Sequence, residues 1–246
     1  MHNGSDIFQI LIVDGGEIPD ALPARIAENI ASVKAAYPDA RHHLLGGNEV
    51  RKFIAARFSR RVLKAYDKLK PYAFKADLAR YCLLYAHGGL YVDVGICLFG
   101  QLEVPAEKSI VFFRDLTSSS KTSWAASNGV LYARPRREEF KLAIDLIVKN
   151  CRKEHYGFNP LFPTGPALLG RVFAIECKAE DYFCGEVKFL PPDYTEHSLG
   201  FVDPGGKTIA KRLKPAGTSF YLGVAGANDY SEIWHRKQVY GERLRR

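Results

Sequence analysis

The sequence has no apolar run that approaches the roughly 20 residues a helix needs to span a bilayer. Its first residues, 1–6, lack the basic-then-apolar pattern of a secretory signal peptide. The five cysteines are an odd number without a C-x-x-C pair, which argues against a disulfide framework and against a zinc site. Internal repeats and low-complexity segments are also absent. These absences predict a globular, cytoplasmic protein.

Acidic residues are the scarcer charge: 35 basic residues against 27 acidic ones give a net charge of +8. This balance favours an anionic partner, such as nucleotide phosphates, nucleic acid or an acidic membrane face. Two basic clusters stand out, namely Arg57, Arg60, Arg61 and Lys64, and Arg236, Lys237, Arg243, Arg245 and Arg246. Neither has the interleaved aromatic residues of a single-strand nucleic-acid groove, so we expect no nucleic-acid partner. Solvated surface is one interpretation of both clusters, and peripheral contact with a membrane or an acceptor through the basic C-terminus is the other.

Short apolar runs alternate with amphipathic stretches along the chain. Strands are predicted at 8–13, 41–45, 90–92, 110–113 and 129–133, and helices at 24–37, 51–69, 73–87, 138–150 and 166–175. Residues 117–127 and 191–207 are predicted to be irregular. The alternation predicts an α/β fold, an open and mainly parallel sheet flanked by helices. A chain of this length fits one domain, so we predict a single domain over residues 1–246.

The clearest element is the helix predicted at 73–87 with the strand that follows it. Its apolar residues form one stripe, in which Cys82 is expected to be a core residue. Asp77 and Arg80 are three residues apart and share a face, which we expect to be the polar side of the helix. Gly88 and Gly89 are expected to end this helix.

Asp93 directly follows the apolar strand, where ligands of open α/β sheets bind. A carboxylate at the end of a core strand needs a partner, and a divalent cation is a natural one. The residue types alone also allow a simpler interpretation, a surface ion pair for Asp77 and Arg80 and a turn cap for Asp93.

The order of residues from Lys75 to Asp93 resembles a known family signature. The segment has Lys-Ala-Asp at 75–77, Arg-Tyr at 80–81, Leu-Tyr at 84–85 and Gly-Gly-Leu-Tyr-Val-Asp at 88–93. Without a gap, it resembles the glycosyltransferases that share the DXD sugar-binding region. These include bacterial and fungal mannosyl- and galactosyltransferases and, more distantly, the glucosylating clostridial toxins. Further similarities lie at 128–130 (Asn-Gly-Val), 164–166 (Thr-Gly-Pro) and 234–235 (Trp-His).

The resemblance implies a GT-A-like, Rossmann-like fold and a hexosyltransferase that retains the anomeric configuration. Its donor would be a UDP- or GDP-hexose and its acceptor a glycan or a lipid-linked molecule, as in polysaccharide biosynthesis. The residues implied to bind the donor sugar are Asp77, Arg80, Asn128 and Gly165. Asp93 would ligate Mn²⁺ or Mg²⁺ at the diphosphate, with His235 as a further ligand; a surface residue packed beside Trp234 is the alternative for His235.

The resemblance implies no strong covalent nucleophile, and no catalytic base is assigned. The candidates are Asp115, Asn128 and Asp229.

Two positions depart from the family. Leu11 lies where many members have a tryptophan near the nucleotide base, and Gly95 replaces the last aspartate of D-x-D. A glycine has no side chain to bind a metal. The cation could therefore use Asp93 with phosphates, water and a C-terminal group, or the enzyme could depend less on metal. The third interpretation is a catalytically silent protein that binds a nucleotide sugar on the same fold.

Overall fold

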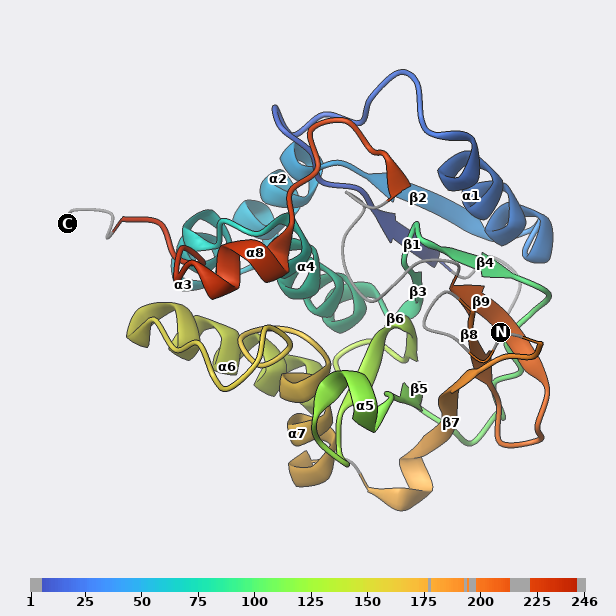
Figure 1. The fold of residues 1–246 in the computed structure, drawn as a ribbon. Helices are drawn as coiled ribbons and strands as arrows, with labels where there is room; N and C mark the ends of the chain where they lie inside the picture. Colours follow the sequence, from blue (N-terminus) through green and yellow to red (C-terminus); the bar gives the residue numbers. More distant parts are fainter. Residues whose placement is uncertain (1–5, 177, 193, 195–197, 213–221, 243–246) are drawn as a thin grey trace.

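The structure is a computed structural model that describes residues 6–176, 178–192, 194, 198–212 and 222–242 (Figure 1). A nine-stranded sheet lies at its centre. The strands are β1 (Asp6–Ile10), β2 (Arg41–Leu45), β3 (Gly89–Val92), β4 (Ile96–Leu98), β5 (Ile110–Arg114), β6 (Ala126–Ala133), β7 (Tyr182–Phe189), β8 (Leu199–Val202) and β9 (Thr208–Arg212). The helices are α1 (Ala24–Ala36), α2 (Gly47–Arg57), α3 (Arg60–Lys68), α4 (Tyr72–His87), α5 (Thr117–Ser120), α6 (Glu138–Lys153), α7 (Pro166–Glu176) and α8 (Tyr230–His235), with a short 3₁₀ helix at Ala179–Asp181.

The sheet is mixed, with the strand order β2-β1-β3-β6-β5-β7-β8-β9-β4. The pairs β1–β2, β1–β3 and β5–β7 are parallel, and the other five pairs are antiparallel. The α/β class is confirmed, but the expectation of a mainly parallel sheet is wrong. The sequence pattern missed β7, β8 and β9, whose meander-like pairing supplies two of the antiparallel contacts.

The sheet is strongly curled. Strands β3 and β4 are joined by only residues 93–95, yet β4 is the far edge strand and β3 lies next to β1. In a flat sheet they would be about 29 Å apart at the usual strand spacing. The link between Val92 and Ile96 spans at most about 14 Å. The sheet therefore bends back so that β9 and β4 approach the end of β3, and the Ser32 hydroxyl of α1 accepts the backbone N–H of Leu98 in β4 at 3.0 Å.

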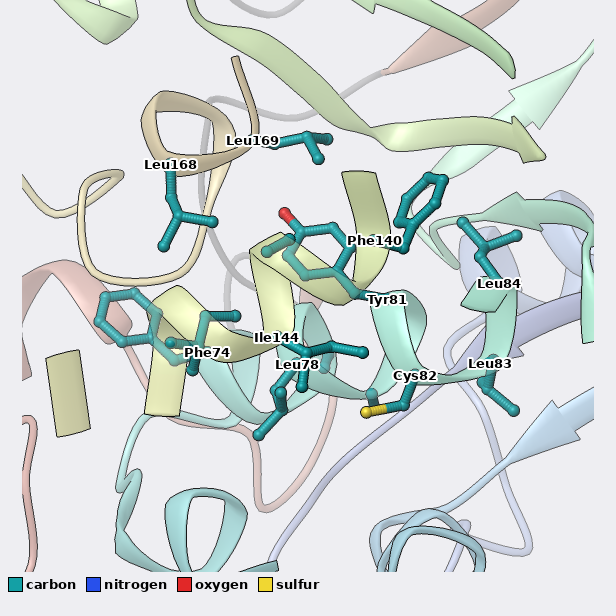
Figure 2. Close-up of a cluster of buried hydrophobic side chains, with 14 of the residues drawn as sticks. Phe74, Leu78, Tyr81, Cys82, Leu83, Leu84, Phe140, Ile144, Leu168 and Leu169 are labelled. Carbon is teal, nitrogen blue, oxygen red and sulfur yellow. The ribbon is translucent and has the colours of Figure 1, made fainter. Parts of the chain in front are cut away.

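Every residue of helix α4 from Ala76 to Leu84 is buried, and Figure 2 shows the apolar side chains of this helix. Phe74, Leu78 and Tyr81 pack toward α6 and α7 in one apolar cluster that also includes Cys82, which is fully buried as expected. The helix ends at Gly88 and Gly89, both with positive φ (68° and 94°). A Cβ at Gly89 would lie 2.3 Å from the carbonyl oxygen of Asp6, so this close approach of the start of β3 to β1 requires glycine.

Three predicted segments differ from the structure. The single helix expected at 51–69 is two helices, because Phe58 and Ser59 are extended between α2 and α3. The irregular segment 191–207 contains β8, and 117–127 contains α5 and the start of β6. The strands among these elements are recognised from their pairing in the sheet, β8 with β7 and β9, and β6 with β3 and β5.

The first basic cluster lies exposed on α2 and α3, in keeping with a solvated surface. In the C-terminal cluster, the Nζ of Lys237 lies 4.3 Å from the ring centre of Trp234, and 243–246 are outside the described residues. Within the described ranges, none of the helices combines the length and the apolar character needed to cross a membrane.

Candidate active site

One edge of the sheet gathers the ends of several strands. Strand β6 is antiparallel to both β3 and β5, so β3 and β5 end at the same edge. Strand β7 is parallel to β5, and β8 reverses the direction once before β9, so β9 ends there too. Asp93 follows β3, Asp115 follows β5, and Arg212 is the last residue of β9. Three charged residues therefore come to one edge, which the curl closes into a compact group.

Asp77 and Arg80 face this edge from α4, and both are buried (7% and 4% exposed). Their expected place on a polar helix side is wrong, and the surface ion pair is excluded. The Nη2 of Arg80 lies 3.2 Å from Oδ1 of Asp77. The prediction failed because the polar face of α4 is covered by β6 and by the loop before α7, which the local pattern does not reveal.

A closed ring of hydrogen bonds holds Asp77. The Asn128 amide donates to Asp77 Oδ1 at 2.8 Å and to the Tyr81 hydroxyl at 3.1 Å. The Tyr81 hydroxyl donates to the carbonyl of Thr164 at 3.1 Å, and the Thr164 hydroxyl donates to Asp77 Oδ2 at 2.7 Å. The ring ties α4 to β6 and to the Thr-Gly-Pro loop. A Cβ on Gly165 would lie 3.4 Å from Asp77 Oδ2, so the loop backbone packs directly against this carboxylate.

Arg80 connects the ring to the end of β3. Its Nη1 lies 3.1 Å from Asp93 Oδ1 and donates to the backbone carbonyl of Asn128. The Tyr91 hydroxyl donates to the same oxygen of Asp93 at 2.8 Å, and the guanidinium lies 4.4 Å from the Tyr91 ring centre. Three of the predicted donor-site residues, Asp77, Arg80 and Asn128, thus form one continuous network with the predicted metal ligand Asp93.

Burial shifts the protonation equilibria of this network. Desolvation raises the pKa of the Asp77 carboxyl, although Arg80, Thr164 and Asn128 partly oppose this effect. Burial lowers the pKa of the Arg80 guanidinium, but Asp93, Tyr91 and Asp77 outweigh it and the net shift is upward. Arg80 is therefore charged, and its charge is what allows a carboxylate to be buried at Asp77.

The two carboxylate oxygens of Asp93 differ, because only one of them contacts other side chains. Both contacts described above use Oδ1, whereas Oδ2 makes no hydrogen bond with the described residues, and the side chain is 34% exposed. Gly129 lies against it, because a Cβ there would be 3.1 Å from Oδ2 and 2.9 Å from Ile96 Cδ1. A larger residue at 129 would displace the carboxylate.

The residues present fit a cation only if the phosphates of a bound nucleotide and water provide most of the cation's coordination shell. Across the part of the chain that the structure describes, no three His, Cys, Asp or Glu residues are grouped so that they could hold a metal. Mg²⁺ often binds through one carboxylate together with phosphates and water, which Asp93 could provide. His235 is exposed on α8 with its ring 5.0 Å from that of Trp234, so its role as a metal ligand stays a prediction.

Two residues near the site carried no signal in the sequence, Arg212 and Tyr230. Burial raises the pKa of the Tyr230 hydroxyl; the nearby Arg212 lowers it, and Asp77 and Asp115 raise it further. These four side chains are therefore within electrostatic range of one another. Asp115 is half-buried, and desolvation raises its pKa against the effect of Arg212. Asp229, by contrast, caps α8 by accepting the N–H of Ser231 at 2.8 Å.

Comparisons with known proteins find similar sequences and a similar fold. Residues 23–111 match the family model described as the glycosyltransferase sugar-binding region containing the DXD motif. An uncharacterized glycosyltransferase of Acanthamoeba polyphaga mimivirus is 31% identical over 144 residues, which are 58% of this chain and 53% of that protein. The chain thus spans about half the length of this relative.

Among solved structures, the PaToxG glycosyltransferase superposes with a TM-score of 0.52 at 19% identity, over 71% of this chain and 70% of that one. At this identity the likeness shows the fold alone, a GT-A-like mixed sheet flanked by helices. Asp77, Arg80 and Asp93 all lie within the segment that matches the family model. The family resemblance is confirmed for part of the chain: residues 23–111 match the sugar-binding region of the glycosyltransferases with the DXD motif.

Proposed function

We propose that this chain is a retaining glycosyltransferase that moves a hexose from a UDP- or GDP-sugar to a glycan or lipid-linked acceptor. The observation that carries the proposal is the continuous network from Thr164 through Asp77 and Arg80 to Asp93. It lies at the sheet edge where α/β folds bind ligands. Its charged members belong to the matched sugar-binding region.

In this proposal the buried ring binds the donor sugar. The carbonyl oxygen of the Asn128 side chain makes no hydrogen bond with the described residues and can accept one from a sugar hydroxyl. Asp77 Oδ2 keeps acceptor capacity beside its bond to Thr164, and the small Gly165 lets the sugar approach it. Arg80 holds both carboxylates in place and acts on the sugar through them.

The reaction breaks the bond between C1 of the sugar and a diphosphate oxygen, which keeps the electron pair. The acceptor oxygen forms the new bond to C1, and its proton passes to the released diphosphate. Asp93 would hold a Mn²⁺ or Mg²⁺, which would supply positive charge to the leaving group. The protein's own part is to orient Asp93 through Arg80 and Tyr91, because a pre-oriented carboxylate needs no rearrangement during the reaction.

A catalytically silent nucleotide-sugar-binding protein is the second candidate, and Gly95 is the observation that favours it. Incubation of the protein with UDP- and GDP-hexoses, with Mn²⁺ and without acceptor, separates the two. Slow release of free hexose from one donor, lost in Asp93→Asn, is the expected result. Binding of a donor with no hydrolysis and no transfer to any glycan or lipid acceptor would support the silent protein instead.

We also propose that the basic C-terminus makes the contact with an acidic membrane or acceptor. The backbone N–H of Lys70 donates to the carbonyl of Val239 at 2.8 Å, and that of Gly241 to the carbonyl of Lys68 at 2.7 Å. A deletion must therefore begin after Glu242 to leave these contacts intact. Deletion of 243–246 should weaken binding to vesicles that contain phosphatidylserine more at low salt than at high salt. An equal loss at both ionic strengths would contradict an electrostatic role.

A further inference from the structure

The departing diphosphate needs positive charge nearby, but the N–H groups of Arg80 already contact groups of the protein. The Arg80 Nε donates to the Ala76 carbonyl, Nη1 contacts Asn128 and Asp93, and Nη2 contacts Asp77. Its side chain is only 5% exposed. Arg80 is thus committed to the protein, and with Gly95 in place of an aspartate, Asp93 is the one carboxylate for a cation at this strand end.

Arg212 brings a second guanidinium to the same edge. It pairs with Ile96, the first residue of β4, and the N–H of Ile96 donates to the carbonyl of Asp93 at 3.0 Å. The Arg212 backbone is therefore one strand away from the turn that carries Asp93. This proximity exists because the curled sheet brings its far edge back to its centre.

The side chain of Arg212 is held near the site without being neutralised there. Its charge acts on both Asp115 and Tyr230, yet it makes no ion pair with a carboxylate of the described residues. Its Nε is buried and has no hydrogen-bond partner within the described ranges. Leaving such a donor unsatisfied costs about 1–3 kcal/mol, so an acceptor from a ligand is expected to bind it.

We infer that Arg212 binds the diphosphate of the nucleotide-sugar donor from the β9 side of the site. This inference rests on the proposed function. The planar guanidinium fork matches two phosphate oxygens, which makes arginine well suited to this contact. The negative charge of Asp115 acts on Arg212 in the absence of donor without forming an ion pair with it. Arg212 thereby supplies a fixed positive charge where the chain has lost a metal-binding carboxylate.

Calorimetric titration of UDP and of GDP into the intact chain, in EDTA and in Mn²⁺, tests the inference. The wild type should bind one of the two nucleotides in EDTA, and Arg212→Gln should weaken that binding at least about tenfold, the value of one charge-assisted hydrogen bond. Arg212→Lys should lie between the two. Lys211→Gln is the matched control, since it removes the same charge from the neighbouring position, on the other face of the strand, and should leave the affinity unchanged.

Asp115→Asn tests the same contact, but its expected effect on diphosphate affinity is the opposite of that of Arg212→Gln. Removing the negative charge beside Arg212 should tighten diphosphate binding in EDTA, and an unfolded protein cannot produce this result. Equal affinities of wild type, Arg212→Lys and Asp115→Asn would overturn the inference even if Arg212→Gln fails to fold. Wild-type binding that requires Mn²⁺ would overturn it as well. Failure of the wild type to bind either nucleotide, with or without Mn²⁺, would instead overturn the proposed function.

Discussion

Arg80 and Asp93 join helix α4 to the end of strand β3 through a contact of 3.1 Å between Nη1 and Oδ1. The ring of Tyr91 lies beneath the guanidinium, and its hydroxyl donates to the same carboxylate oxygen. Asp93 is therefore fixed by two side chains before any ligand binds, and its second oxygen makes no hydrogen bond with the described residues. A site with this preorganisation is sensitive to small displacements.

Asp77→Asn should separate the role of the buried charge from that of the hydrogen bonds. The amide can accept fewer of the bonds from Thr164, Asn128 and Arg80, so the free energy of unfolding should fall by about 1–3 kcal/mol. Turnover should fall at least about tenfold, since Arg80 would lose one of its two carboxylates. Denaturant unfolding and donor hydrolysis measure the two effects.

The matched control for Asp77→Asn is Asp67→Asn, which removes an aspartate paired with Arg51 on the surface at 2.7 Å. Surface pairs contribute less than about 1 kcal/mol, so this variant should behave as wild type. Wild-type turnover in Asp77→Asn would refute the sugar-binding role. Asp77→Ala is a less informative variant, because it leaves the Arg80 charge buried and should cost about 3–5 kcal/mol of stability.

Gly129→Ala tests the position of Asp93. The added methyl group would lie 2.9 Å from Ile96 Cδ1 and 3.1 Å from Asp93 Oδ2, so one of the two must shift. We expect a loss of turnover of about tenfold or more, together with about 1–3 kcal/mol of destabilisation from overpacking. Gly100→Ala is the control, as no atom lies within 4 Å of the added Cβ. Equal turnover in the two variants would show that Asp93 tolerates displacement.

The elements that the sequence revealed are those with a strong local pattern. The stripe through Phe74, Leu78 and Tyr81 with Gly88 at its end was enough to place α4, and the apolar run before Asp93 placed β3. Neither pattern shows that the opposite face of α4 is covered as well. The burial of Asp77 and Arg80 arises from residues far away in the chain, so it became visible only in the folded protein.

The same limit applies to Arg212. Strand β9 is five residues long, and a basic residue at its end is unremarkable as a local pattern. Its place near Asp93 depends on the strand order and on the pairing of Ile96 with Arg212. The family signature located half of the site, and the sheet topology was needed for the other half.

Gly95→Asp would restore the family's second carboxylate. Gly95 is not among the glycines with positive φ, so an aspartate is compatible with its backbone. We expect Mn²⁺ to bind the variant more tightly than the wild type in the absence of nucleotide, by about tenfold, because the cation gains one oxygen ligand. Calorimetric titration of Mn²⁺ into both proteins measures this. Strong nucleotide-free binding already present in the wild type would indicate another ligand, with His235→Asn as the variant to examine first.

The stability of the protein should depend on pH through His42. Burial, together with Lys34 and His43, lowers the pKa of His42 from 6.5 to about 4. The unfolded chain then binds a proton that the folded chain does not, so stability should decrease as the pH falls from about 6.5 to about 4. In His42→Asn the melting temperature should decline less steeply over this range. His235→Asn, which replaces an exposed histidine, should keep the wild-type slope; a wild-type slope in His42→Asn would contradict the assignment.

The curl of the sheet has a consequence for how the site is made. Strand β4 lies three residues after Asp93, yet its neighbour β9 is synthesised much later. Closing contacts between such distant segments is the slow part of folding. A growing chain on the ribosome can form α4 and β3 early, but it cannot complete the surroundings of Asp93 until β9 has emerged. We therefore expect a protein truncated before Thr208 to have the signature residues without the complete surroundings of Asp93.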